Sequence, residues 1–353
     1  MIRAVLAVGL LLSLTSPVWA QSTGSPALDA QIEESVAALK RGDKTTARRL
    51  GEEAAKSGAP MALNNLVVML DNGVGGPRDP ARARALLEQA AAAGLPVAEL
   101  NLGVRLHFSD DPTEQARGYA LLRKASADEK VKPLTLWPLG RAQLLGIGTA
   151  RDMPAGVATL ETSLKVDPGR ADAWYLVGRA YQNGWGGVAP DPAKAYSHLK
   201  EGARLGDNRA ERYVGMALLN GDGVERDEVA AMAAFRSAAQ QGNVDAMIDI
   251  AVMLALGEGV PADAVQARAW YRRAADKGSV HALRGLGAML ARGEGGAAEP
   301  ATGRAYLELA EQGGDPNARK ILDGALGALP AANRGQIDAA KAAWRKEHAP
   351  PAH

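Results

Sequence analysis

The apolar residues between positions 245 and 278 follow a helical period in two blocks, separated by a glycine-rich break. The first block predicts an amphipathic helix that buries Ala246, Ile250, Ala251 and Leu254. The second block predicts a helix with a buried stripe of Ala267, Trp270, Tyr271, Ala274 and Ala275. Between them, Gly257-Glu258-Gly259-Val260 is a tight turn, because glycine can end a helix in the left-handed conformation. Asp263 then caps the second helix by accepting its free amide hydrogens.

The same unit recurs along the chain at a period of about 36 residues. One alanine marks the register of each first helix: Ala62, Ala98, Ala173, Ala210, Ala246, Ala282 and Ala318. Glycine pairs follow at Gly73/Gly75, Gly146/Gly148, Gly184/Gly186, Gly221/Gly223 and Gly293/Gly295, and capping aspartates at Asp79, Asp152, Asp191 and Asp227. A fixed period of this length predicts an all-α solenoid of helix-pair repeats. Solenoids offer long binding surfaces and seldom carry chemistry in the repeat itself.

A small residue also recurs inside the first helix of each unit. It is Gly103, Gly140, Gly178, Gly215, Ala251 or Gly287. Glycine inside a helix costs about 1 kcal/mol relative to alanine, so its recurrence needs a reason. We expect a neighbouring helix to approach closely at this position, which lets a chain with 2 Phe bury a continuous core through many small contacts.

These motifs together resemble the Sel-one-like repeat, a relative of the tetratricopeptide repeat. Gly221-Asp222-Gly223-Val224 and Trp270-Tyr271-Arg272-Arg273-Ala274-Ala275 carry the resemblance best, and it covers residues 61–315, about seven repeats. The unit at 97–130 departs from it, because His107-Phe108-Ser109-Asp110-Asp111 replaces the glycine turn, and the unit at 131–170 is also irregular. The resemblance implies a right-handed superhelix of helix pairs. For an exported member, it also implies adaptor and regulatory roles in the cell envelope.

The first twenty residues form a separate segment with the pattern of a secretory signal. Arg3 precedes an apolar run from Ala4 to Leu14, and Val18 and Ala20 are small residues before a cleavage point after Ala20. The alternative is an uncleaved membrane anchor, but the run is shorter than the roughly 20 apolar residues of a span. We therefore expect a periplasmic or secreted protein with no integral membrane segment after cleavage.

The two ends of the array read as caps. Residues 21–60 contain a helix pair without the glycine turn, at Leu28 to Lys40 and Thr45 to Ser57. Residues 316–353 contain a final helix from Gln336 to Glu347 and a Pro-rich tail. Terminal units of solenoids are atypical because they shield the last apolar face.

Composition excludes several classes of function. Lys plus Arg is 41 and Asp plus Glu is 40, so no charge excess indicates a nucleic-acid partner. The chain has no cysteine, which removes disulfides and thiolate chemistry. Its histidines are scattered without paired spacing, at His107, His198, His281, His348 and His353. We therefore expect neither a metal site nor a cofactor.

One short motif tests the possibility of an enzyme. Ser197 and Lys200 fit the Ser-x-x-Lys pattern of penicillin-interacting serine enzymes. No Ser-Asp-Asn or Lys-Thr-Gly partner follows, so the motif is better interpreted as part of an ordinary second helix. The sequence thus predicts no catalytic residues.

The candidate binding residues come from the register of the first helices. In tetratricopeptide geometry these helices line the concave groove, and the inward positions lie three before and one, four and five after the recurring small residue. They are Trp137, Arg141, Tyr175, Arg179, Gln182, Asn183, Arg212, Asn220, Arg284 and Arg292. Arginine forks bind carboxylates, and aromatic and arginine side chains are frequent energetic centres of interfaces. The alternative, left open here, is that Trp137 and Tyr175 pack between helices and that the arginines are solvated.

The sequence thus predicts an exported scaffold that binds another envelope protein along its groove. The expected partner segment is extended or acidic and belongs to a sensor, a secretion machine or a polysaccharide-assembly system. The first alternative is a carbohydrate- or cell-wall-binding scaffold, because aromatic, Arg and Asn surfaces also suit sugars. The second is a hydrolase of cell-wall or β-lactam substrates.

Overall fold

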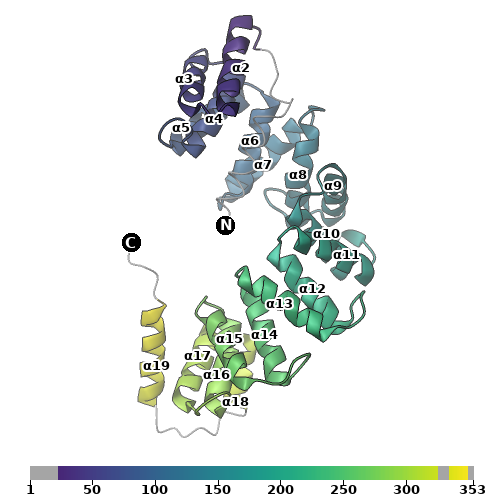
Figure 1. The fold of residues 1–353 in the computed structure, drawn as a ribbon, viewed down its shortest axis with the longest axis vertical. Helices are drawn as coiled ribbons and strands as arrows, with labels where there is room; N and C mark the ends of the chain where they lie inside the picture. The colour runs from purple at the N-terminus through teal and green to yellow at the C-terminus, as the bar shows by residue number, and fades with distance from the viewer. Residues whose placement is uncertain (1–22, 325–333, 349–353) are drawn as a thin grey trace. The chain divides into compact units, whose positions relative to one another are not determined.

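The computed structural model describes residues 23–324 and 334–348, and every regular element in these ranges is helical (Figure 1). The predicted signal segment at 1–20 and residues 349–353 of the predicted tail lie outside them. Within the described part of the chain, no helix combines the length and the apolar composition that crossing a bilayer requires.

Consecutive helices pack in pairs, as the repeat pattern predicts. The helices are α2 (Pro26–Lys40), α3 (Lys44–Ala55), α4 (Pro60–Asn72), α5 (Pro80–Ala92), α6 (Pro96–His107), α7 (Pro112–Ala125), α8 (Lys132–Leu145), α9 (Met153–Val166), α10 (Ala171–Asn183), the 3-10 turn η2 (Trp185–Gly187), α11 (Pro192–Arg204), α12 (Asn208–Asn220), α13 (Glu228–Gln240), α14 (Val244–Leu256), α15 (Ala264–Ala275), α16 (Val280–Arg292), α17 (Pro300–Gln312), α18 (Pro316–Asp323) and α19 (Arg334–Glu347). Helices α2 to α9 with η2 form one compact unit, and α10 to α19 form a second.

The glycine turns have the predicted backbone. Helix α14 ends at Gly257, whose φ of 77° is left-handed, and its amide hydrogen bonds to the Met253 carbonyl. Gly259 has a φ of 68°. The Asp263 carboxylate then accepts the Gln266 amide hydrogen 2.9 Å away. Both glycines have positive φ in the other predicted turns as well, so the helix-turn-helix prediction is confirmed.

The second glycine of each turn has an additional reason to be glycine. A Cβ atom on Gly223 would lie 2.1 Å from the carbonyl oxygen of Pro192, in the first turn of the preceding repeat's second helix. The equivalent distances are 2.1 Å from Gly148 to the Gln115 oxygen and 2.2 Å from Gly295 to the Ala264 oxygen. The turn of one repeat therefore lies directly on the backbone of the repeat before it.

The recurring small residue sits where the two helices of one repeat meet. A Cβ atom on Gly215 would lie 2.7 Å from the Phe235 ring, and one on Gly178 would lie 2.8 Å from the Leu199 side chain. Phe235 and Leu199 are fully buried. The predicted close approach is confirmed, and it pairs one small residue with one large residue in each of these repeats.

The predicted stripe of α15 is only partly correct. Ala267, Ala274 and Ala275 are buried, but Trp270 and Tyr271 are half-buried. The Arg273 guanidinium lies over the Trp270 ring at 4.6 Å. Tyr271 leans toward the next repeat, where a Cβ atom on Gly285 would meet its ring at 2.4 Å. These rings cover the edge of the core and do not fill it.

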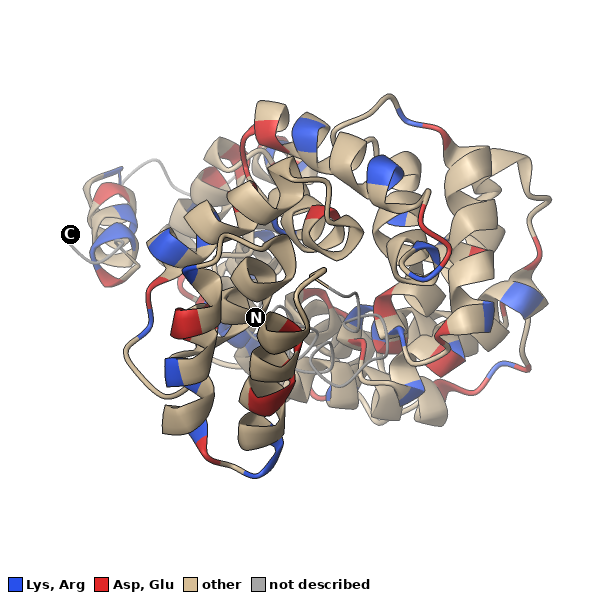
Figure 2. Ribbon diagram, turned by 90° about the horizontal axis from the view of Figure 1, so that it is seen from above, with Lys and Arg blue, Asp and Glu red and all other residues tan. Residues whose placement is uncertain are grey.

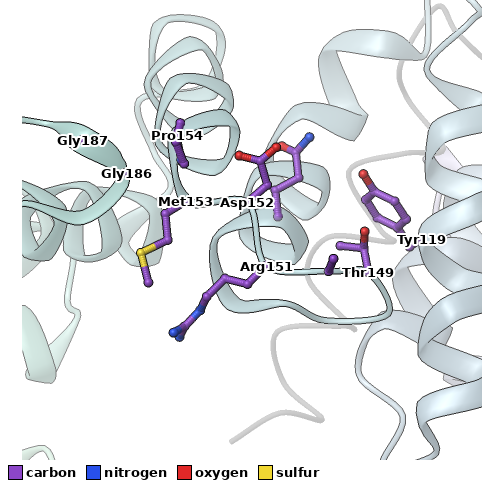
Figure 3. A pocket seen from close by; sticks show the side chains of 10 residues that line it. Tyr119, Thr149, Arg151, Asp152, Met153, Pro154, Gly186 and Gly187 are labelled. Carbon is purple, nitrogen blue, oxygen red and sulfur yellow. The ribbon is translucent and has the colours of Figure 1, made fainter.

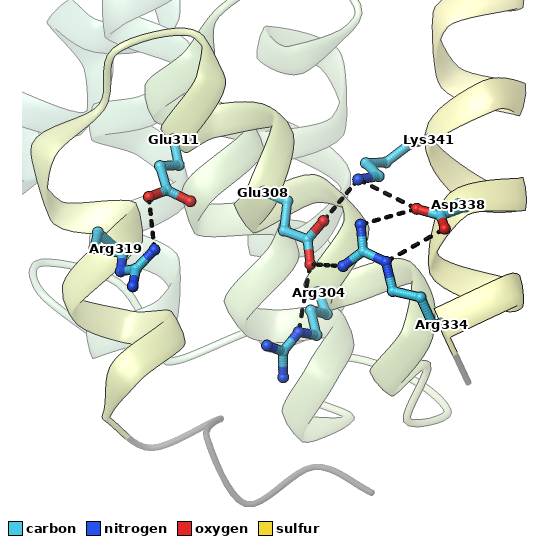
Figure 4. Close-up of polar contacts among 7 residues, drawn as sticks. All are labelled: Arg304, Glu308, Glu311, Arg319, Arg334, Asp338 and Lys341. Carbon is cyan, nitrogen blue, oxygen red and sulfur yellow. Dashed lines mark hydrogen bonds and ion pairs between the residues drawn. The ribbon is translucent and has the colours of Figure 1, made fainter. Parts of the chain in front are cut away.

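The C-terminal helix α19 packs on α17, the second helix of the last repeat. Trp344 of α19 lies edge-on to Tyr306 of α17, with ring centroids 4.9 Å apart. Beside this contact, Glu308 pairs with Lys341 at 2.7 Å and with Arg334 at 2.8 Å (Figure 4). Apolar burial and a network of charges thus hold α19 to α17.

Candidate interaction surface on the first helices

The predicted binding residues lie on the first helices of the repeats, and the two units divide them. Trp137 and Arg141 are on α8 of the first unit. The others are on α10, α12 and α16 of the second unit. They therefore form two separate sets.

In the first unit, Trp137 packs inside the protein. Its side chain is 8% exposed, and its ring lies 6.1 Å from Phe108 and 6.5 Å from His107. Arg141 donates a hydrogen bond from Nη1 to His107 Nε2 at 2.5 Å and lies over the Phe108 ring at 5.0 Å. The irregular segment that replaces a glycine turn thus supplies an aromatic cluster. For Trp137, the geometry favours the alternative of packing between helices.

His107 is held neutral in this cluster. Burial and the neighbouring Arg141 charge lower the pKa of His107 to about 4. A neutral ring nitrogen can accept the hydrogen bond that Arg141 donates, whereas an imidazolium cannot.

In the second unit, Tyr175 belongs to a stack of aromatic and arginine side chains. The Tyr175 and Tyr213 rings are 6.0 Å apart, the Arg209 guanidinium lies over Tyr175 at 4.3 Å, and that of Arg179 lies over Tyr213 at 3.9 Å. Burial raises the pKa of the Tyr175 hydroxyl. Tyr213 and Arg209 were not among the predicted residues, because the predicted register selects only certain positions of each first helix.

Arg212 and Arg284 bind carboxylates of this chain, whereas the sequence pattern predicts arginines that bind a partner's carboxylates. Arg212 reaches Asp249 of α14 through Nε at 2.5 Å and Nη2 at 3.2 Å. Arg284 donates from Nε to Asp315 at 2.9 Å. Each acid belongs to a later helix, so these arginines join successive repeats.

The Asp315 carboxylate is the more deeply buried of the two acids. Burial raises its pKa, but hydrogen bonds from His281, Arg284 and the Asn317 amide outweigh that effect and lower the pKa to about 2. Asp315 also caps α18 through the Asn317 amide at 2.9 Å. For Asp249, the effect of burial is larger than that of the Arg212 hydrogen bonds, so the pKa of the carboxyl group is raised.

The remaining predicted residues cluster at the C-terminal ends of their helices. Asn183, Asn220 and Arg292 are exposed. Arg292 lies 3.4 Å from Glu294, and the Asn183 amide donates to the Arg179 carbonyl. The Gln182 Oε1 atom is buried and accepts no hydrogen bond from a described residue.

Sequence reasoning missed the apolar part of this surface. Val252 and Leu256 of α14 are 37% and 66% exposed and occupy the repeat positions of Arg179 and Asn183. Partly buried Ile248 occupies the position of Tyr175. The sequence prediction selected aromatic, basic and amide residues, so it passed over a helix whose residues at those positions are aliphatic. The same register would have found them.

The hollows in the surface follow the repeat and do not mark a special site. One, of about 700 Å³, lies beside Arg151, Asp152 and Gly186 (Figure 3). Another, of about 820 Å³, lies at the equivalent place beside Arg226, Asp227 and Gly259. Both aspartates already cap the helix that follows them. Among the described residues, no three His, Asp or Glu side chains gather as a metal site would require.

Comparison with known proteins decides the family. The Sel1 repeat model matches residues 60–95, 96–128, 171–207, 208–243, 244–279 and 280–315, which together make up more than half of the chain. The chain belongs to the Sel1 repeat family. Sel1 repeats are scaffolds suited to protein–protein interaction. A comparison with curated protein sequences gives no match.

Two solved structures support the Sel1 fold over nearly the whole chain. A Sel1 repeat protein from Oxalobacter formigenes is 26% identical, with a TM-score of 0.60 over 89% of this chain and 93% of that one. A protective antigen of uropathogenic Escherichia coli strains with an SLR fold is 22% identical, with a TM-score of 0.58 over 92% and 77%. At that identity, the likeness to the antigen shows the fold alone.

The Sel1 model passes over the unit formed by α8 and α9, yet this unit keeps the repeat's construction. Gly146 and Gly148 have φ values of 74° and 67°, and a Cβ atom on Gly140 would lie 2.9 Å from Leu160. Pro138 inside α8 is a departure in its sequence.

Proposed function

We propose that this Sel1 repeat protein is an exported scaffold that binds another protein of the bacterial cell envelope through the first helices of its second unit. The signal-like segment before Gln21 supports export. The Sel1 repeats support a binding role, because a repeat array presents a long surface with no chemistry of its own.

The observation that carries the proposal is the mixed surface at equivalent positions of α10, α14 and α16. Exposed Asn183 and Arg292 occupy on α10 and α16 the repeat position that exposed Leu256 occupies on α14, and exposed Val252 lies four residues before Leu256. Apolar anchors supply binding energy, amides recognise a peptide backbone, and arginine pairs with carboxylates. An extended partner segment with an aliphatic anchor and a nearby acidic residue suits this arrangement.

Arg212 and Arg284 have a supporting role in the proposal. A partner carboxylate would have to displace Asp249 or Asp315, and breaking a desolvated ion pair is costly. We therefore assign direct contact to Arg292, and to Arg212 and Arg284 the task of fixing the helices that carry the surface.

The test has two stages, of which the first identifies the partner by crosslinked capture from periplasm. In the second, Leu256→Asp is titrated against the purified partner and weakens binding by tenfold or more, as expected for burying a charge at an apolar anchor. The matched control is Val166→Asp, because Val166 is 53% exposed but lies on a second helix of the first unit, α9. Equal affinity of both variants and the unmodified protein would place the binding surface elsewhere.

Export has its own test. Sequencing the N-terminus of the protein recovered from periplasm should give Gln21 as the first residue. A mature chain that still contains Arg3 would contradict export by cleavage.

A further inference from the structure

One position on the second helices carries an acid in some repeats and an exposed cation in three others. It lies nine residues after the N-cap. In the first unit it is Glu52 in α3 and Glu88 in α5. In the second unit it is Lys200 in α11, Arg236 in α13 and Arg272 in α15, followed by Glu308 in α17, which pairs with Lys341 and Arg334. Charges of both signs occur throughout the ribbon (Figure 2), so what matters is whether each charge has a partner.

The glutamates of the first unit are paired with the next second helix. Arg82 of α5 donates to Glu52 from Nη1 at 2.9 Å and from Nη2 at 2.5 Å. Arg117 of α7 holds Glu88 in the same two-pronged way. Adjacent second helices therefore lie within reach of each other's long side chains, and their charges cancel.

The cations of the second unit lack such partners. In the first unit, Arg82 pairs with Glu52 from the third position after the N-cap of the next second helix. In α13, α15 and α17, this position holds an uncharged residue: Ala230, Gln266 and Thr302. The three cationic side chains are exposed and form no hydrogen bond or ion pair with a described residue. The acids on these helices are engaged elsewhere: Glu201 with Arg204, Glu228 with Arg226 and Asp276 with His348.

The same helix face carries exposed aliphatic residues beside the cations. Val229 and Val265 are 68% and 67% exposed and lie seven residues before Arg236 and Arg272, so they share a face of the helix. Packed helices are on the order of 10 Å apart, which sets the spacing between successive cations. The result is a row of three positive charges across α11, α13 and α15, with a shorter apolar row beside it.

We propose that this cationic row binds an extended acidic protein segment that runs across the second helices, on a different surface from the one in the proposed function. A polyproline II chain has three residues per turn and rises about 3.1 Å per residue, so an acidic residue at every third position recurs roughly every 9 Å on one face. That spacing matches the row. Lys200, Arg236 and Arg272 share a positive charge but differ in shape, so the row offers a partner charge and not a fixed side-chain geometry.

An anionic membrane fits the surface less well. The turn before Val229 exposes Asp222 and Glu225, which an anionic bilayer would repel. A narrow peptide can lie along the cations and avoid these acids.

The experiment uses the full chain and a fluorescent Glu-Pro-Pro repeat peptide of about twelve residues. Anisotropy should show binding that weakens as salt rises. Arg236→Ala should reduce the affinity about two- to fivefold, and the triple variant K200E/R236E/R272E should abolish binding. The matched control is Arg82→Ala, since Arg82 is an exposed cation on a second helix that is already paired with Glu52.

Three results would overturn the proposal. The first is equal affinity of the triple variant and the unmodified protein for the acidic peptide. The second is equally tight binding of a Gln-Pro-Pro peptide. The third is binding to phosphatidylglycerol vesicles that the triple change abolishes, with no binding of the acidic peptide. Circular dichroism and thermal melts establish that each variant is folded. Should the triple variant unfold, R236Q with K200Q gives the same comparison without introducing negative charge.

Discussion

At the scale of single residues, two buried titratable side chains are each held in one charge state by their neighbours. His107 is neutral in an aromatic cluster beside Arg141. Asp315 is ionised between His281, Arg284 and the start of α18. Both link successive repeats, so their protonation affects how well neighbouring repeats are joined.

His107 should make the first unit sensitive to mild acid. Its pKa falls from 6.5 to about 4 on folding, so between these values the unfolded chain binds a proton that the folded chain does not. Stability is therefore lost as pH decreases from about 6.5 towards 4, by roughly 1–3 kcal/mol. Urea unfolding followed by hydrogen exchange of α6 and α8 at several pH values measures this loss. His107→Gln should flatten the pH dependence of this stability. If the variant keeps the original pH profile, groups other than His107 cause the dependence.

Asp315 should stabilise the end of the array through its charge. Asp315→Asn keeps a capping side chain but removes the carboxylate from Arg284 and His281, so we expect a loss of about 2–4 kcal/mol. The folded pKa of about 2 lies below the ordinary 3.8, so the contribution is complete above 3.8 and lost as pH falls through 2. Thermal melts at pH 7 measure the loss. His281→Gln is the comparison, and it should cost less because that side chain is 56% exposed.

At the scale of the elements, the two glycines of a turn meet different requirements. Gly221 needs a left-handed backbone to end α12. It has room for a side chain, because a Cβ atom there would lie 3.6 Å from the nearest heavy atom. Gly223 needs left-handed backbone and also space against the Pro192 carbonyl. The first ends a helix, and the second docks one repeat on another.

This division predicts unequal effects of the same substitution. Gly221→Ala should cost about 1–2 kcal/mol, the penalty for left-handed backbone in a residue with a Cβ atom. Gly223→Ala adds a clash with backbone and should cost about 3 kcal/mol or more. Denaturant unfolding of both variants gives the comparison, with hydrogen exchange in α11 reporting the loss of docking. Equal costs would show that the turn relaxes away from the preceding repeat without penalty.

The sequence was sufficient to predict the helices, the glycine turns and the aspartates that cap the second helices, because each has a local signal at a fixed spacing. It did not predict that Trp270 is half-buried, since periodicity identifies the face of a helix and not how far the neighbouring repeat covers it. It also did not predict the ion pair between Arg212 and Asp249, which joins side chains 37 positions apart. Contacts between repeats depend on how the repeats stack, and the residue pattern within one repeat does not determine that stacking.

At the scale of the whole molecule, packing between neighbours distributes stability along the chain. Phe235 is fully buried and Trp270 is not, so Phe235→Ala should cost about 3–5 kcal/mol and Trp270→Ala about 1–2 kcal/mol. Hydrogen exchange after Phe235→Ala should increase in α12 to α15 and stay unchanged in α2 to α5. An equal increase in all helices would indicate a single cooperative core.

The contact at the second glycine also bears on how such a chain can lengthen. The atom that Gly223, Gly148 or Gly295 approaches is a main-chain carbonyl oxygen, supplied by proline, glutamine and alanine in turn. Every amino acid carries that oxygen, so the incoming repeat is indifferent to the identity of the residue beneath it. A duplicated stretch of gene would thus encode a repeat that already fits its new predecessor, without a matching mutation there. At this contact, copying alone is then enough to extend the array.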